Sequence, residues 1–519
     1  MNIEKLKKYR FKLLVLFLIF FIVILPSIYV AISLAGKISA GAVIPGYYNA
    51  YAHIPNPIRT ADKLFAHELF SDILATHSFY EYLPVVSNIR ESGILEKKRV
   101  RFAGRGPLDW AFFSDGKFIA TWDMGILAPF VRFFVNLSDD FPDPNLHYVR
   151  AGRKSRFEYR TANNITYIQR YRNLLIISNN LELFESIIDG TFRNTKIGRN
   201  PSKKFISTDF DAGFLVLSDD VRTRIATSPM IGAFLENLKF SDFSEIALSI
   251  LPAQIDASII SSITSDNERL GNLLSRDSKV IGLAQHLPVN TRNSVIYSIG
   301  SIEEIINASL AVHTQRAPVN LRQIDRSARI FLGTGLNDLL FSWTGTEIAV
   351  LQLEGNPLPV FVLQVTDEQK REEIFDRAFS PVITTENASL TMDVPEITQI
   401  TLPRFLNLLL NMWGINFLEP YFIVQNDFLF ISESAESLVS AISSIRKNNV
   451  LSETDVWHSL SKAGSDKSSL TLFYSLGHSL PSFLSGENNF ADILRLYKQG
   501  LIRANITNNV LTVKLSIAQ

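Results

Sequence analysis

One segment, residues 421–444 (YFIVQNDFLFISESAESLVSAISS), constrains the fold of this chain most. Its pattern predicts a strand, a tight turn, a second strand and an amphipathic helix in close succession. A similar segment occupies residues 167–190, where NLLIIS from Asn173 corresponds to DFLFIS from Asp427. A supersecondary pattern that recurs indicates an internal repeat. We therefore expect the chain to be built from two related units.

Other segments recur in the same order. A tryptophan opens a strand-like stretch at Trp110 and again at Trp343, and segments 246–261 and 502–517 both alternate apolar with polar residues. This period of two predicts antiparallel hairpins with one buried face. The length of 519 residues also exceeds what a single core usually serves. Two units of ordinary domain size follow.

The amino-terminal region contains an apolar run of 22 residues without a charge, which begins at Leu13 and ends at Leu34. A helix of this length crosses the hydrocarbon layer of a bilayer, which is roughly 30 Å thick. Lysines and an arginine precede the run, so the positive-inside rule places the amino terminus in the cytoplasm. The prediction is a single-pass protein of the bacterial inner membrane whose bulk is periplasmic. The alternative is a secreted protein, cleaved from its signal peptide near Ala35.

The predicted fold class is α+β, an N-terminal transmembrane helix followed by two tandem repeated units of antiparallel β-sheet with covering helices. The predicted organisation is a cytoplasmic tail (1–12), a transmembrane anchor (13–35), a first extracytoplasmic unit (43–263), a linker (264–285) and a second extracytoplasmic unit (286–519).

Composition and motifs exclude several classes of function. The 51 basic residues balance 51 acidic ones, which disfavours a nucleic-acid partner. The absence of cysteine excludes disulfides, thiol nucleophiles and iron–sulfur ligation. None of the eight histidines has a metal-ligand spacing, and neither a nucleophile elbow nor a phosphate-binding loop is present. We predict no catalytic residue, no cofactor and no metal.

One cluster of charge is notable. Within residues 147–160 (HYVRAGRKSRFEYR) the basic side chains are Arg150, Arg153, Lys154, Arg156 and Arg160. Such a patch binds anionic lipid headgroups, lipopolysaccharide or an acidic protein. Two alternatives remain open, a solvated basic strand pair without a partner, and electrostatic attraction to the acidic segment 385–396 of the other unit.

The layout of membrane anchor and paired units, with the motif NDFLFISESAESLVSAI beginning at Asn426, resembles families of uncharacterised bacterial envelope proteins. The resemblance implies a membrane-tethered, extracytoplasmic protein and carries over no site residues. The predicted function is a non-enzymatic binding or structural module of the cell envelope with a protein, lipid or glycan partner. The alternatives are a hydrolase or transferase with a site between the units, and a lipid or transport accessory protein with a continuous apolar groove.

Overall fold

The computed structural model describes the following residues: 27–28, 36–76, 83–91, 93–96, 98–125, 128, 145–151, 154–161, 164–189, 210–218, 240–264, 282–298, 321–356, 358–379, 397–400, 417, 419–462, 468–475 and 495–519. Within them, 19 strands are hydrogen-bonded into one antiparallel sheet. The chain forms two compact units. Unit 1 is Met1–Ala66, Tyr82–Val216 and Ala247–Ile250, and unit 2 is His67–Glu81, Leu217–Ile246 and Leu251–Gln519.

The prediction of two tandem repeated units was wrong. Segment 246–261, which was expected to close the first unit, contains strand β10 (Gln254–Ser262). This strand pairs along its whole length with the last strand of the chain, β19 (Val510–Ala518), from Gln254 opposite Ala518 to Ser262 opposite Val510. Alternation of apolar residues specifies which face of a strand is buried but not which strand lies beside it. The unpaired backbone groups at a strand's edge favour such joining.

The described residues do not support the predicted transmembrane helix. No helix within the described residues is long and apolar enough to cross a membrane. The apolar run of residues 13–34 itself lies outside the described residues except for positions 27 and 28. Apolar length reports how a segment partitions between water and lipid, and this property alone does not establish a helix. We therefore do not retain the anchor as an element of the structure.

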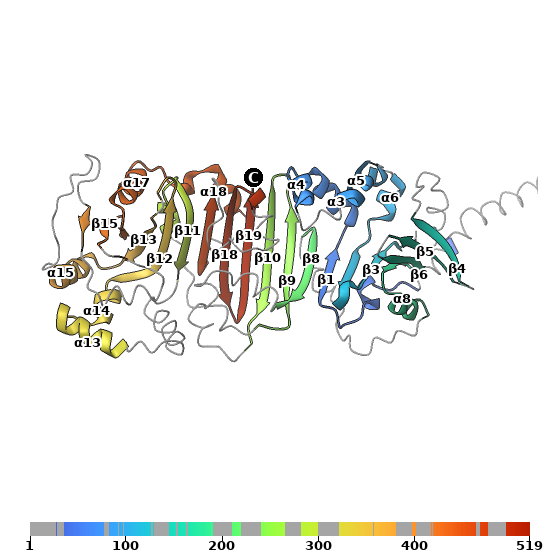
Figure 1. Cartoon of the computed structure of the whole chain (residues 1–519), viewed down its shortest axis with the longest axis horizontal. Helices are drawn as coiled ribbons and strands as arrows, with labels where there is room; N and C mark the ends of the chain where they lie inside the picture. Colours follow the sequence, from blue (N-terminus) through green and yellow to red (C-terminus); the bar gives the residue numbers. More distant parts are fainter. Residues whose placement is uncertain are drawn as a thin grey trace, which may run out of the picture. The chain divides into compact units, whose positions relative to one another are not determined.

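The strands of unit 1 pair in the order β8–β1–β2–β3–β7–β6–β5–β4 (Figure 1). Their bounds are β1 Ala50–Ile54, β2 Leu108–Phe112, β3 Phe118–Asp123, β4 Leu146–Ala151, β5 Lys154–Arg160, β6 Ile165–Tyr171, β7 Leu174–Ser178 and β8 Ala212–Leu217. The helices are η2 Ala40–Val43, α3 Pro57–Ala66, α5 Leu83–Glu91, η4 Ile94–Glu96, α6 Lys98–Ala103, η5 Ser114–Gly116 and α8 Leu181–Ile188.

One face of the unit 1 sheet forms its core. Tyr51, Ala111, Ile119, Leu174 and Ile176 are completely buried there. Helix η2 packs against β2 and β3, and α8 packs against β6 and β7. Leu183, Phe184 and Ile187 are the buried residues of α8. This spacing of three to four places them on one helix face and explains why the sequence forms an amphipathic helix here.

The strands of unit 2 pair in the order β14–β15–β16–β13–β12–β11–β17–β18–β19–β10–β9, where only residues 243–246 of β9 belong to this unit. Besides β10 and β19, their bounds are β9 Phe243–Ile250, β11 Thr291–Ser298, β12 Thr344–Leu353, β13 Val360–Val365, β14 Thr398–Gln399, β15 Tyr421–Gln425, β16 Phe428–Ser432, β17 Leu470–Ser475 and β18 Gln499–Thr507. The helices are α4 Phe70–Ala75, η9 Leu283–His286, α13 Leu321–Leu332, α14 Leu336–Phe341, α15 Glu368–Phe379, α17 Ala435–Arg446, η10 Leu451–Glu453 and α18 Asp455–Ser461.

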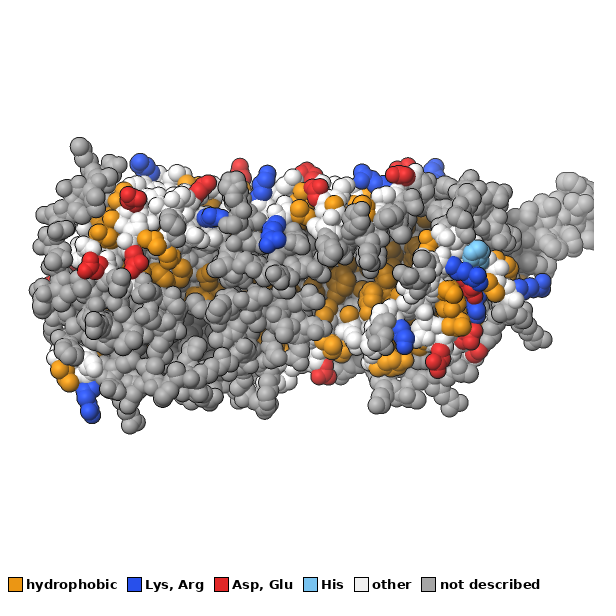
Figure 2. All heavy atoms as spheres, viewed as in Figure 1, with side chains coloured by type: hydrophobic (Ala, Val, Ile, Leu, Met, Phe, Trp, Pro, Cys, Tyr) orange, Lys and Arg blue, Asp and Glu red, His pale blue; other side chains and the backbone are white. Residues whose placement is uncertain are grey.

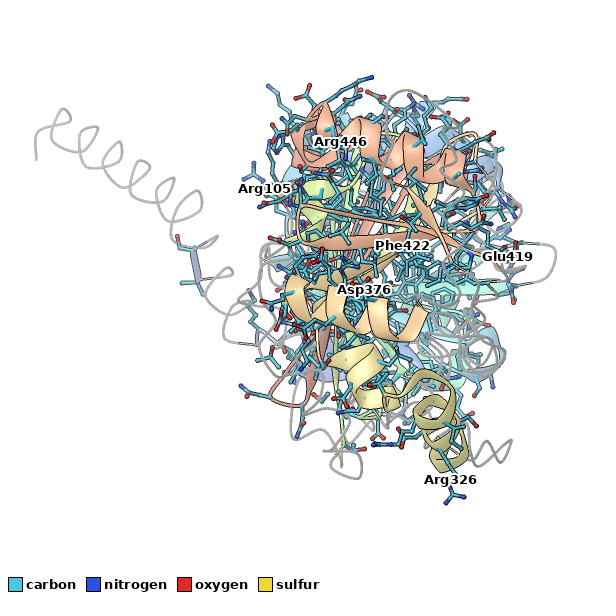
Figure 3. All side chains as sticks on the ribbon, turned by 90° about the vertical axis from the view of Figure 1, so that its left-hand side faces the viewer. Arg105, Arg326, Asp376, Glu419, Phe422 and Arg446 are labelled. Atoms are coloured by element: carbon cyan, nitrogen blue, oxygen red, sulfur yellow. The ribbon has the colours of Figure 1, made fainter. Side chains whose placement is uncertain are left out.

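Hairpin β15–β16 and helix α17 confirm the order of elements predicted for residues 421–444. Asn426 and Asp427 both have a positive φ, as a tight two-residue turn requires. The Ser434 side chain accepts a hydrogen bond from the backbone N–H of Ser437 and caps α17. Figure 3 shows α17, which carries Arg446, and α15, which carries Asp376, on opposite sides of the strand that contains Phe422. Both faces of this hairpin are therefore covered by helices.

Candidate functional site

The predicted basic patch lies on hairpin β4–β5, and the pleat of the strands divides it. Val149 is paired with Arg156 and Arg150 with Ser155, so Arg156 and Arg160 lie on one face of the sheet while Arg150 lies on the other. Lys154 belongs to β5, but its side chain and all of Arg153 lie outside the described residues. Arg150 therefore does not share a face with Arg156 and Arg160.

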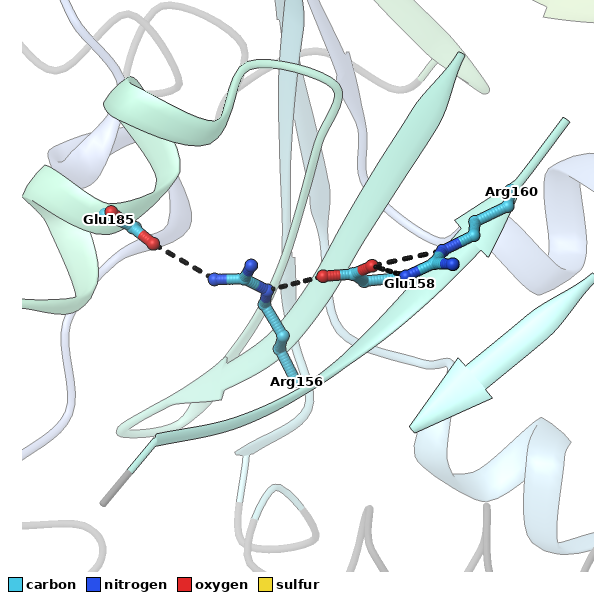
Figure 4. A network of polar contacts seen from close by, with 4 residues as sticks. All are labelled: Arg156, Glu158, Arg160 and Glu185. Carbon is cyan, nitrogen blue, oxygen red and sulfur yellow. Dashed lines mark hydrogen bonds and ion pairs between the residues drawn. The ribbon is translucent and has the colours of Figure 1, made fainter. Parts of the chain in front are cut away.

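On the first face, Glu158 joins the two arginines in a closed network (Figure 4). Arg156 Nε donates to one oxygen of Glu158 at 2.9 Å, and Arg160 Nη2 donates to the other at 2.8 Å. Arg156 Nη1 also donates to Glu185 of helix α8 at 3.0 Å. The guanidinium of Arg156 stacks on the ring of Tyr167 with 5.1 Å to the centroid, a favourable cation–π geometry.

The network favours the charged forms of Glu158 and Arg156. Burial by itself raises the pKa of Glu158, but hydrogen bonds from Arg160 and Arg156 outweigh it and lower the pKa below its usual value. Burial likewise lowers the pKa of Arg156, and its hydrogen bonds to Glu158 and Glu185 outweigh this and raise it. Two positive and two negative charges cancel within the group. Arg156 therefore joins β5 to α8, and neither it nor Arg160 offers much charge to an anionic partner.

A second polar cluster, which sequence reasoning missed, lies in the core of unit 1. The Asp109 carboxylate accepts a hydrogen bond from the Tyr51 hydroxyl at 2.6 Å and contacts His53 Nδ1 at 2.5 Å. The side chains of His53 and Asp109 are only 8% and 1% exposed. The pair is 56 residues apart in the chain and matches no motif, so only the pairing of β1 with β2 reveals it.

This cluster contains the residue types of an acid–base site, but a substrate could not reach them. A histidine held by a carboxylate serves catalysis when it reaches a substrate or nucleophile. Here the surrounding core excludes solvent from both groups, and Phe210 packs edge-on against the imidazole. Within the described residues, no group of three or more histidine or acidic side chains is arranged to hold a metal ion. We interpret Tyr51, His53 and Asp109 as a structural hydrogen-bonded cluster.

The second face of the unit 1 sheet carries an unbroken line of apolar side chains, which we call the apolar row. From β4 to β8 the apolar row consists of Tyr148, Phe157, Ile168, Ile177, Ala120, Trp110, Ala52 and Phe214. Its members other than the two alanines remain partly exposed, and Tyr148 is 53% exposed. Figure 2 shows hydrophobic side chains gathered over the part of the view in which Figure 1 places β1, β3 and β8.

The sequence of β7 does indicate that both faces of this strand are apolar. In LLIIS of β7 both the inward and the outward positions are apolar, which is typical of a strand covered on both faces. Leu174 and Ile176 are indeed completely buried, whereas Leu175 and Ile177 on the second face are only partly so. The pattern alone predicts a second covering layer but does not reveal what supplies it.

No family model matches the chain, and no curated protein matches it. Among solved structures, crystal forms I, III and IV of a protein named TP0453 are similar, with identities of 12%, 12% and 11% and TM-scores of 0.30, 0.29 and 0.26. The matches cover 46%, 46% and 44% of this chain and 88%, 86% and 82% of TP0453. TM-scores this low establish neither a shared fold nor a shared function.

Proposed function

We propose that the chain is a non-enzymatic binding module of the cell envelope and acts outside the cytoplasm. The apolar row is the observation that supports a binding role. A long apolar row whose larger side chains stay partly exposed on the described part of the chain marks an interaction site. The two polar clusters of unit 1 favour the same conclusion, because the groups of each are satisfied by one another and by the core.

Location is tested with an alkaline phosphatase domain fused after Gln519, since this reporter folds to an active enzyme only outside the cytoplasm. We expect phosphatase activity in intact cells, together with an inactive cytoplasmic reporter at the same position. Activity of the cytoplasmic reporter alone would exclude an envelope role.

The non-enzymatic character is tested by complementation of a deletion strain at matched protein levels. Ile168→Asp places a charge in the apolar row and should abolish complementation. Lys447→Asp, at an exposed position after α17, is the matched control. His53→Gln should complement, because it removes the acid–base group of the buried cluster without emptying the site. Loss of function in His53→Gln at normal protein level would instead favour catalysis.

A further inference from the structure

The apolar row is long and without polar interruption. Between β6 and β8 it crosses six strands, which at a spacing of about 4.8 Å corresponds to about 24 Å. Ala52 and Ala120 lie on either side of Trp110 in this line and are 3% and 4% exposed. Apart from the phenol of Tyr148 and the indole of Trp110, no member has a polar group.

Positive charge lies at one end of this line. Arg170 is on the same face of β6 as Ile168, and Arg150 is on the same face of β4 as Tyr148, so both arginines belong to the adjacent transverse line. Both are exposed. Within the described part of unit 1 neither pairs with a carboxylate, and the Arg170 Nε donates to the Arg172 carbonyl oxygen at 2.8 Å. They contrast with Arg156 and Arg160, which Glu158 and Glu185 neutralise on the other face.

We propose that the apolar row binds one acyl chain of an anionic lipid, with the headgroup between Arg150 and Arg170 and the chain running from β6 toward β8. This deepens the proposed function and rests on it. A row of about 24 Å accommodates a chain that spans one leaflet, about half of the 30 Å hydrocarbon layer. A protein partner would require hydrogen-bonding groups along its interface, and the middle of the row has almost none. The acidic headgroup supplies the charge that the two arginines complement.

Occupancy of the row is tested with the purified full chain and dibromostearate, whose bromine atoms in mid-chain quench tryptophan on contact. Trp110 lies in the row and Trp122 lies beside Leu175 on the same face, whereas Trp457 is buried in unit 2. We expect saturable quenching below the micellar concentration of the probe. Most of it should disappear in Trp110→Phe with Trp122→Phe, whereas Trp457→Phe should retain it.

The headgroup position is tested by charge reversal. Arg150→Glu and Arg170→Glu should each weaken stearate binding about tenfold, as expected for one lost hydrogen bond to a charged group. Lys447→Glu, an exposed reversal after α17, is the matched control and should bind normally. Unchanged binding in both arginine variants would overturn the assignment of the headgroup.

Two further results would overturn the proposal. One is the absence of saturable quenching by the monomeric probe. The other is binding that occurs only with vesicles of phosphatidylglycerol, which would make the face a membrane-docking surface. Neither result would change the outcome of the location and complementation tests. The lipid-binding proposal can therefore be wrong while the proposed function is still supported.

Discussion

The hairpins β6–β7 and β15–β16 have similar sequences, but their second faces differ. In unit 2 that face is closed by α14 and α15, and Leu429 of β16 is 1% exposed in a cluster with Leu339, Trp343 and Ile374. In unit 1 Leu175 of β7 remains partly exposed. The difference teaches that an apolar strand pattern becomes core or surface according to the helices packed on it. The half-covered face of unit 1 is where we place binding.

The largest expected effect tests this difference directly. Leu429→Ala should reduce the free energy of unfolding by about 2–5 kcal/mol, the usual cost of truncating a buried leucine. Leu175→Ala should cost less than about half as much, because its side chain is already partly in contact with water. Denaturant unfolding gives both values, and hydrogen exchange assigns each loss to its own hairpin. Equal losses would mean that the second face of unit 1 is as well covered as that of unit 2.

Local elements could be predicted from the sequence, but their partners could not. Periodicity located β15, β16 and α17 correctly. It gave no indication that β10 lies beside β19, because a period of two carries no information about the neighbouring strand. Asn173 shows the same limit. Although it corresponds to Asp427 in sequence, its side chain exchanges two hydrogen bonds with the backbone of Ile38, 135 residues away.

The two strand faces divide Arg150 from Arg156 and Arg160 for a related reason. A run of charges in a sequence suggests one surface, whereas a strand sends alternate side chains to opposite faces. The sequence also shows no feature that predicts the neutralisation of Arg156 and Arg160 by Glu158 and by Glu185 of α8. Because Arg150 is an even number of residues from Tyr148 and is paired with Ser155, the strand pairing separates it from Arg156 and Arg160.

The second prediction concerns the ionic network that joins β5 to α8; between α17 and β15 the Arg446 Nε donates instead to the neutral side chain of Gln425, at 2.9 Å. Glu158→Gln should cost about 1–3 kcal/mol, because the buried arginine Arg156 loses its charged acceptor. Glu185→Gln is the matched control on the same network. Its side chain is 50% exposed, so its loss should stay below about 1 kcal/mol.

The same substitution predicts a pH dependence. The pKa of Glu158 is lowered on folding, so its ionised form stabilises the fold above the ordinary value of 4.5, and this stability disappears as the pH falls through the lowered pKa. Urea unfolding of the parent chain at pH 7 and at pH 3 should show a loss that is smaller in Glu158→Gln. An identical pH dependence in both proteins would show that protonation of Glu158 is not coupled to folding.

The third prediction compares the helix caps. The Asn180 side chain accepts from the Leu183 N–H at 3.3 Å and the Ser434 side chain from the Ser437 N–H at 3.1 Å. Alanine at either cap should cost about 1 kcal/mol. Local hydrogen exchange should reveal the loss more clearly in α8, which has 8 residues, than in α17, which has 12. Asn180→Ser should restore the protection, and failure to do so would mean that the cap itself is not responsible.

The smallest effect distinguishes the two turns. Arg172 has φ 55°, a left-handed conformation that disfavours a side chain such as arginine, whereas Asn426 at φ 51° tolerates it. Arg172→Gly should therefore stabilise unit 1 by about 0.5–1 kcal/mol, and Asn426→Gly should be close to neutral. The gain is reduced by loss of the stacking of Arg172 on Tyr171, at 5.6 Å, which is worth about 0.5 kcal/mol at an exposed site. Thermal unfolding of the two variants measures the difference. Destabilisation by Arg172→Gly beyond that stacking contribution would show that the first turn relies on its arginine side chain, and the two hairpins would then differ in their turns as well as in the layers that cover them.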